Sequence, residues 1–175
     1  LGQPALSEEQ IGWFRSWIAA GAKNDTPETV GQVTATDRPP TYRLPPVITA
    51  LSYSPDGGLL AVSGYREVVL HRTDASGIEA RLVGISDRIQ SLEFSTDGRT
   101  LMAAGGAPAR FGEVQFWDIP TQTLKRSFTS CQDTIFGASL SPDGSKVAFG
   151  CPDHTVRVVE AAGGSELLKM GHHED

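Results

Sequence analysis

The sequence lacks several features that would each assign a class of protein. No apolar run approaches the roughly 20 residues of a membrane-spanning helix, and no signal peptide is visible. No run of Lys and Arg exceeds two residues and the net charge is −6, which disfavours a nucleic acid partner. The two cysteines, Cys131 and Cys151, say little about the compartment. Since no nucleophile–base or paired-carboxylate constellation stands out, we nominate no catalytic residue and expect no enzyme.

What the sequence does contain is typical of a folded protein with many turns. Hydrophobic residues make up 39% and charged residues 21% of the 175 positions, a globular composition. The 19 glycines and 11 prolines suit short strands joined by tight turns. Because the chain opens at Leu1 without a methionine, we expect it to be a piece of a longer polypeptide.

The first 46 residues carry no repeat. Residues 1–22 are predicted to form one helix, with a capping box at Ser7 and Gln10 and a stop at Gly21. Large apolar residues recur at helical spacing on one face, which therefore needs a partner surface: Ile11, Phe14, Trp17 and Ile18. Residues 23–46, rich in Pro, Thr, Asp and Gly, are predicted to be an extended linker.

From residue 47 onward one turn motif recurs three times. Ser-Pro/Thr-Asp-Gly closes a short apolar run at 54–57, 95–98 and 141–144, with starts 41 (95 − 54) and 46 (141 − 95) residues apart. In such a turn Asp hydrogen-bonds the backbone and Gly supplies the positive φ, so Asp56, Asp97 and Asp143 are predicted to be structural. A period near 40–45 residues with several short strands is typical of a β-propeller blade.

Each unit offers four predicted strands. They are 48–53, 59–62, 67–71 and 80–83, then 89–94, 100–104, 114–117 and 123–128, then 135–140, 146–149, 155–159 and 166–170. Strands without polar alternation indicate sheets buried on both faces. The predicted fold class is all-β: a partial β-propeller of three four-stranded antiparallel blades, preceded by one α-helix and a Pro-rich linker. The predicted blades are 47–84, 85–129 and 130–171, with a fourth starting at 171–175 and further blades of the same chain covering the outer sheets.

These units resemble the WD40 family. Trp117-Asp118 stand where the family's Trp-Asp dipeptide ends the third strand, and Gly171-His172 stand where its Gly-His dipeptide opens a new blade. The resemblance covers about three-quarters of the chain, from residue 48 to the end. It implies a non-catalytic platform that binds a protein or an extracellular ligand.

The family's hydrogen-bonded tetrad of Asp, His, Ser and Trp is incomplete in every unit. The second unit has Trp117 but Ile85 in place of the His, and the first has His71 in place of the Trp. In the third unit Asp153 matches the Asp, whereas Cys131 and Val159 replace the His and the Trp. We therefore expect packing to rigidify the blades instead.

The N-terminal helix resembles a different family. Residues 1–22 look like the last helix of the c-type cytochrome domains of large planctomycete proteins, in which WD40-like repeats often follow. The haem-attaching Cys-x-x-Cys-His motif is absent from this sequence, so no cofactor is expected here and haem c would belong to an upstream domain. This resemblance implies an alternative function, an exported electron-transfer protein. It favours a periplasmic or cell-surface location, with the cytoplasm as the alternative.

The two cysteines are predicted to be separate thiols. A hairpin centred on residues 142 and 143 places Cys131 opposite His154, three residues from Cys151. That offset is roughly 10 Å at about 3.3 Å per residue and exceeds the ~7 Å limit for a bridge. Only curvature of the loop could permit the disulfide.

Three possible ligand sets are weighed against simpler interpretations. Cys151, Asp153 and His154 share one turn, where Asp153 more simply orders its own backbone. The terminal His172-His173-Glu174-Asp175 segment fits the loop into a fourth blade better than a metal site. Met102 and Met170 lie in predicted strands and are expected to fill the core rather than bind haem iron. No metal site is therefore predicted.

The loops between second and third strands are the candidate binding elements. Counted as 65–67, 106–113 and 151–155, they hold three, eight and five residues, and unequal loops on one rim of a repeat array are where partners bind. Arginine and aromatic residues are enriched at binding hot spots. The candidate residues are Tyr65, Arg66, Arg110, Phe111, Asp153 and His154.

Overall fold

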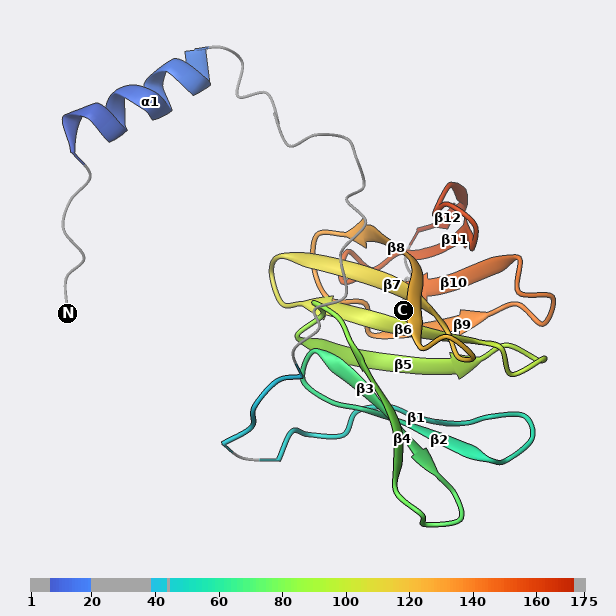
Figure 1. Cartoon of the computed structure of the whole chain (residues 1–175). Helices are drawn as coiled ribbons and strands as arrows, with labels where there is room; N and C mark the ends of the chain where they lie inside the picture. The colour runs from blue at the N-terminus through green and yellow to red at the C-terminus, as the bar shows by residue number, and fades with distance from the viewer. Residues whose placement is uncertain (1–6, 20–38, 44, 172–175) are drawn as a thin grey trace. The chain divides into compact units, whose positions relative to one another are not determined.

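The computed structural model describes residues 7–19, 39–43 and 45–171, in two units that are considered separately (Figure 1). The first unit contains the helix α1 (Glu8–Ala19), which begins where the Ser7 carbonyl accepts a 2.9 Å hydrogen bond from the Ile11 amide. Trp13 and Ile18 are each 63% exposed on it. The predicted stop at Gly21 and the side chains of Gln10, Phe14 and Trp17 lie outside the described part. No helix in the described ranges is long and apolar enough to cross a membrane.

The second unit consists of three antiparallel four-stranded sheets within the described residues, as predicted (Figure 1). Each sheet is one blade, with its strands in chain order. Blade 1 contains β1 (Leu51–Tyr53), β2 (Leu59–Ser63), β3 (Glu67–Arg72) and β4 (Ile78–Val83). Blade 2 contains β5 (Arg88–Phe94), β6 (Thr100–Ala107), β7 (Phe111–Asp118) and β8 (Thr123–Cys131). Blade 3 contains β9 (Gly137–Leu140), β10 (Lys146–Gly150), β11 (Val156–Glu160) and β12 (Glu166–Met170).

The three Ser-Pro/Thr-Asp-Gly turns have the structural role predicted for them. In the third turn the Ser141 hydroxyl donates to Asp143 over 2.6 Å, and Gly144 has φ of +71°. Asp143 also accepts the Ser145 amide at 3.0 Å. Hydrogen bonding by the preceding serine is the largest cause that lowers the pKa of all three turn aspartates, that of Asp143 to about 2. These carboxylates are therefore committed to their own turns.

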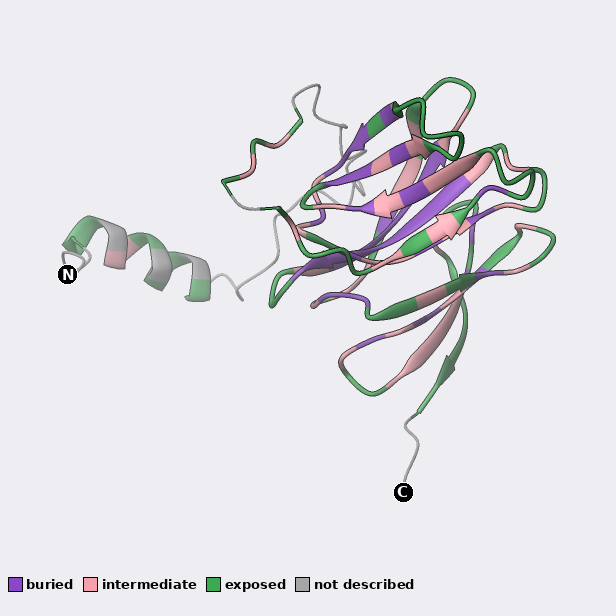
Figure 2. Cartoon of the chain, turned by 90° about the horizontal axis from the view of Figure 1, so that it is seen from below, coloured by how far each residue is buried: buried purple, intermediate pink, exposed green. Residues whose placement is uncertain are grey.

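Blade 2 lies between two hydrophobic cores. Figure 2 shows that the buried residues are concentrated in the strands, whereas the turns are mostly exposed. Alternate residues of the central strands of blade 2 point to opposite sides: Leu101 and Trp117 join blade 1 residues, and Met102 and Phe116 join blade 3 residues. All four side chains are at most 1% exposed. Burying a large apolar side chain contributes about 1.5–3 kcal/mol, so much of the stability of this unit depends on blade stacking.

A network of buried hydrogen bonds lies in blade 2, for which no complete tetrad was expected. Ser86 and Gln115 both donate to Glu113 Oε2, at 2.6 and 2.7 Å, and Trp117 Nε1 donates to Gln115 Oε1 at 3.1 Å. Gly84 leaves room for the amide, since a Cβ there would lie 2.6 Å from Gln115 Nε2. The expectation that packing alone replaces the tetrad was wrong for this blade, because Ser86 and two polar strand residues form a different network.

The outermost strand of blade 3 is exposed along its whole length. All five residues of β12 are exposed, including Met170 at 44%. Met102, in contrast, is fully buried. The prediction that both methionines fill the core was therefore right for Met102 and wrong for Met170, because an edge strand offers no enclosed space to fill.

Candidate functional site

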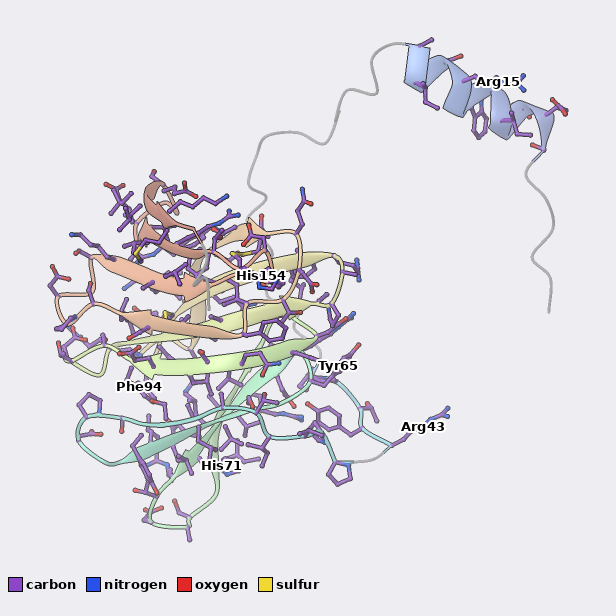
Figure 3. The ribbon with its side chains drawn as sticks, turned by 180° about the vertical axis from the view of Figure 1, so that it is seen from behind. Arg15, Arg43, Tyr65, His71, Phe94 and His154 are labelled. Carbon is purple, nitrogen blue, oxygen red and sulfur yellow. A yellow bond between two sulfur atoms is a disulfide. The ribbon has the colours of Figure 1, made fainter. Side chains whose placement is uncertain are left out.

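One rim of the blades gathers the candidate loops. The loops 64–66, 108–110 and 151–155 each join a second to a third strand, and the connections 84–87 and 132–136 join one blade to the next. Antiparallel strands alternate in direction, so these segments all lie at the same end of the sheets; we call them the loop rim. Figure 3 shows Tyr65 at the opposite end of the sheets from Phe94, which directly precedes the second of the three turn motifs, residues 95–98.

The first loop presents an arginine against a tyrosine. The Arg66 guanidinium lies 5.2 Å from the centre of the Tyr65 ring, and its Nε donates to Asp87 Oδ1 at 2.7 Å. Arg66 has φ of +61°, and its carbonyl accepts the Gly84 amide at 2.8 Å. The loop is thus held to the connection that enters blade 2, while Tyr65 stays 42% exposed.

A buried carboxylate stands directly behind this loop. Glu67 is 1% exposed and accepts hydrogen bonds from Arg81 Nε at 2.8 Å and Nη2 at 2.6 Å. The Tyr42 hydroxyl also donates to Glu67, and it contacts the Tyr65 carbonyl at 3.2 Å. Burial, followed by the bond to Glu67, raises the pKa of Tyr42 to about 12. Residue 42, which was predicted to lie in the extended linker 23–46, is therefore anchored to blade 1.

The second loop is shorter than predicted. β6 continues to Ala107 and β7 begins at Phe111, so the expected eight-residue loop is reduced to 108–110. The reason is close backbone approach: a Cβ on Gly105 would lie 1.9 Å from the Arg88 carbonyl oxygen. Glycines that resembled a loop are thus strand residues without space for a side chain.

Phe111 and Arg110 nevertheless meet at the tip of the second loop. The Arg110 guanidinium lies 5.9 Å from the centre of the Phe111 ring. Ala109, with φ of +55°, donates its amide to Asp133 Oδ1 at 2.9 Å. That bond, followed by the Thr134 amide, lowers the pKa of Asp133. As in the first loop, an aspartate of the next connection fixes the turn.

The third loop is organised by Asp153. Its Oδ1 accepts the Thr155 hydroxyl at 2.6 Å and its Oδ2 accepts Arg157 Nη2 at 2.7 Å. The Thr155 hydroxyl is the largest cause that lowers the pKa of Asp153 to about 2. His154 adopts φ of +62° beside it. Asp153 therefore orders its own turn, as the simpler interpretation held, and Arg157 extends the contact to the Ser130 carbonyl of blade 2 at 2.7 Å.

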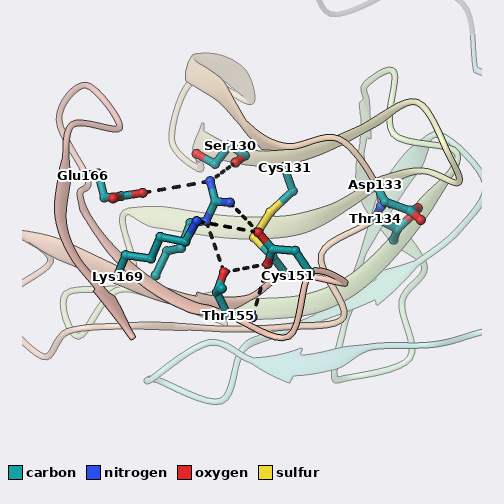
Figure 4. The surroundings of a disulfide bond; sticks show 10 residues. Ser130, Cys131, Asp133, Thr134, Cys151, Thr155, Glu166 and Lys169 are labelled. Carbon is teal, nitrogen blue, oxygen red and sulfur yellow. Dashed lines mark hydrogen bonds and ion pairs between the residues drawn. A yellow bond between two sulfur atoms is a disulfide. The ribbon is translucent and has the colours of Figure 1, made fainter. Parts of the chain in front are cut away.

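Cys131 and Cys151 form a disulfide with a Cα–Cα distance of 6.2 Å, and the prediction of two thiols was wrong (Figure 4). That prediction placed Cys131 in the hairpin of blade 3. Instead, Cys131 ends β8, where it pairs with Gly112 of blade 2, and the chain turns before β9 begins at Gly137. The bond consequently joins blade 2 to the loop 151–155 of blade 3.

A pocket of about 770 Å³ adjoins the disulfide on the loop rim, between blades 2 and 3. Asp133, Asp153 and Arg157 supply its charged groups. Both carboxylates have lowered pKa values and are ionised at neutral pH. The lining therefore carries two negative charges and one positive charge, and this net negative charge favours binding of a basic side chain. We call this cavity the disulfide pocket.

The six predicted residues form three neighbouring pairs, one on each blade. The aspartates that fix two of these loops, Asp87 and Asp133, were not among the predicted residues. A signal for them exists: each stands two residues before an isoleucine that is a predicted strand start, and the two are 46 positions apart (133 − 87). The same spacing separates the second and third turn motifs.

Neither interpretation as a metal site gains support. In the part of the chain that the structure describes, no group of three His, Cys, Asp or Glu residues is arranged to hold a metal ion. The disulfide also removes the Cys151 thiolate from the set that Cys151, Asp153 and His154 could have formed. The segment His172-His173-Glu174-Asp175 lies outside the described residues.

A family model matches one repeat of the chain. The model WD40, described as WD domain, G-beta repeat, matches residues 122–160. The segment runs from β8 of blade 2 to β11 of blade 3, so the repeat in sequence is offset by one strand from the blade in structure. The disulfide lies within it.

Curated relatives are similar over parts of their length. Coronin-7 of Bos taurus is 30% identical over 141 residues, which are 75% of this chain and 15% of coronin-7. Serine-threonine kinase receptor-associated protein of Dictyostelium discoideum is 35% identical over 56% of this chain and 31% of its own. Protein groucho of Drosophila melanogaster is 37% identical over 36% and 8%. The chain thus spans at most about a third of these three relatives.

Solved structures share the fold. The chains titled "Structure of U3-55K" and "Crystal structure of RRP9 WD40 repeats" each superpose with a TM-score of 0.64 at 17% identity. The alignments cover 78% of this chain and 42% and 41% of those chains. Together, the matched repeat and the shared propeller fold support a WD40 repeat domain in this chain.

Proposed function

We propose that the chain is a non-catalytic scaffold that binds a protein partner or an extracellular ligand through its loop rim. The observation that carries this proposal is the fixation of the loops. Asp87 and Asp133 hold the first two turns at 2.7 and 2.9 Å, while the Tyr65–Arg66 and Arg110–Phe111 pairs lie at the loop tips. Loops fixed before binding lose little conformational entropy when a partner docks.

The chemistry of the rim fits a protein partner. Arginine and aromatic side chains are enriched where binding energy concentrates. The disulfide pocket, with Asp133 and Asp153, offers a place for a basic side chain of the partner. The Dictyostelium relative is itself named as a receptor-associated protein, which is consistent with an interaction role.

The experiment replaces Arg110 and Phe111 by alanine. The double variant is expected to retain at least tenfold less of a bound partner than the wild type, since a hot-spot truncation costs about 2 kcal/mol or more. The measurement is quantitative capture from an extract of the source organism, with the bound proteins determined by mass spectrometry. Because Phe111 is a strand residue, thermal unfolding of the variant checks that its replacement has not disrupted the fold.

Thr96→Ala with Arg99→Ala is the matched control, because both side chains are exposed at the opposite rim. A specific partner is one that the wild type and this control retain equally. Equal retention by the Arg110→Ala/Phe111→Ala variant would remove these two residues from the binding surface.

The disulfide supports export. Disulfides persist in oxidising compartments and are rare in the cytosol, so we propose a location in the periplasm or at the cell surface, with the cytoplasm as the alternative. The electron-transfer alternative depends on the resemblance of residues 1–22 to a cytochrome helix. A haem absorption band in the full-length protein would support it, and its absence would leave the scaffold.

A further inference from the structure

A second cavity lies between blades 2 and 3 at the end opposite the loop rim. It is an open cavity of about 620 Å³, lined by Arg126 of blade 2 and by six residues of blade 3. Arg126 comes from β8, Ser145 from the turn before β10, Lys146 from the start of β10, Glu160 from the end of β11, and Leu167 from β12. Because both walls belong to described neighbouring blades, the cavity does not depend on any further blade.

Arg126 is the unusual member of this lining. Its guanidinium lies 4.3 Å from the centre of the Phe116 ring, a residue that is 1% exposed. Its Nε is buried and has no hydrogen-bond partner among the described residues. In contrast, Arg66, Arg81 and Arg157 each meet a carboxylate within 2.7 Å. Burial also lowers the pKa of Arg126.

A cation that is partly withdrawn from water and left without a counter-charge is costly. Guanidinium groups bind carboxylates with two parallel hydrogen bonds. An incoming carboxylate would therefore supply the partner that the described residues do not give to Arg126. The stacking on Phe116 holds the group in one orientation for such a contact.

The remaining lining residues favour an acidic ligand with an apolar neighbour. Arg126 and Lys146 contribute two positive charges and Glu160 one negative charge, so the lining carries a net charge of +1 in a chain of net charge −6. Leu167 is 47% exposed and adds an apolar wall. The volume is within the range of pockets that enclose ligands larger than a simple ion, roughly 300–1,000 Å³.

We propose that this cavity binds an acidic peptide segment of a partner protein, with a glutamate or aspartate carboxylate on Arg126 and Lys146 and an apolar side chain on Leu167. This site is separate from the loop rim and does not depend on the function proposed for that rim. It gives the scaffold a second partner-binding surface at the end of the sheets opposite the loop rim.

The test uses a labelled peptide with alternating leucine and glutamate, titrated against the 175-residue chain by fluorescence anisotropy. The matched peptide has glutamine in place of each glutamate. The glutamate peptide is expected to bind at least tenfold more tightly, because its carboxylates make charge-assisted hydrogen bonds with the guanidinium that neutral amides do not make. Its affinity should fall as salt is added.

Two variants locate the binding. Arg126→Met keeps an unbranched stem over Phe116 and removes the charge, and it is expected to weaken binding of the glutamate peptide by about ten- to a hundredfold. Lys146→Gln, which removes the more exposed cation, is expected to weaken it less. Arg99→Ala, exposed at the same end but outside the lining, should bind like the wild type.

Any one of the following results would overturn the proposal. The first is no binding of the glutamate peptide by the wild type up to millimolar concentration. The second is equal affinity for the glutamate and glutamine peptides, or unchanged affinity in both Arg126→Met and Lys146→Gln. The third is competition by free glutamate as effective as that by the unlabelled peptide, which would assign the cavity to small anions.

Discussion

Replacing Arg81 by alanine is expected to lower the free energy of unfolding by about 3–5 kcal/mol. The reason is the environment of Glu67, whose side chain is 1% exposed and receives two hydrogen bonds from the Arg81 guanidinium. Without Arg81 a carboxylate would remain buried with, among the described residues, only the Tyr42 hydroxyl donating a hydrogen bond to it. Urea denaturation at neutral pH measures the change.

The control is Arg72→Ala, on the same sheet. Arg72 pairs with Glu79, and the two side chains are 52% and 29% exposed, so the loss should be below about 1 kcal/mol. Replacing Glu67 and Arg81 together by methionine should restore much of the stability, because no unpaired buried charge remains. An Arg81→Ala variant no less stable than Arg72→Ala would contradict the role assigned to Arg81 as the partner of the buried Glu67 carboxylate.

Removing the disulfide should have the second largest effect. Cys131→Ala with Cys151→Ala is expected to lower the free energy of unfolding by about 3 kcal/mol, the loop-closure entropy for a sequence separation of 20 residues. Because Cys151 is 7% exposed, alanine is preferred to serine, which would bury a hydroxyl. The measurement is urea denaturation with and without a reductant.

The reductant and the double variant remove the same bond in two ways, so each serves as a control for the other. Reductant should shift the unfolding midpoint of the wild type to that of the double variant and leave the variant unchanged. A wild type that is insensitive to reductant after oxidative purification would show that the bond does not stabilise the packing of blade 2 against blade 3.

The fold was predictable because its signals are local and repeated. Each Ser-Pro/Thr-Asp-Gly turn contains its own hydrogen bonds, such as Ser95 to Asp97 at 2.6 Å, and so can be recognised without knowledge of the rest of the chain. The apolar runs around the turns then predict the strands. The lack of alternation in residues 59–62 and 68–70 indicated sheets that are buried on both faces. The strand β6 is buried in this way, whereas β2 is only partly buried.

The candidate site was harder to predict because its contacts join different blades. Asp87 and Asp133 act on loops that precede them by 21 and 24 residues, and Tyr42 reaches Glu67 over 25 residues. Such contacts depend on how blades stack, which a pattern within one blade does not contain. The cysteine prediction failed for the same reason, since Cys131 belongs to blade 2 and not to the hairpin of blade 3.

Glycine misled the interpretation of the second loop. A Gly-Gly pair normally indicates a turn, yet Gly105 and Gly106 are strand residues. A Cβ on Gly106 would lie 2.0 Å from the Phe111 carbonyl oxygen. Only the partner strand reveals this constraint, so the sequence alone favoured a long loop.

Stacking of blades is the central claim, and amide hydrogen exchange of the 175-residue chain tests it most directly. Blade 2 is covered on both faces, whereas β12 is exposed throughout. The amides of β6 and β7 should therefore exchange most slowly, near the limit set by global unfolding, and those of β12 fastest. Equal protection of the three sheets would mean that stacking does not stabilise the blades, and would contradict the account.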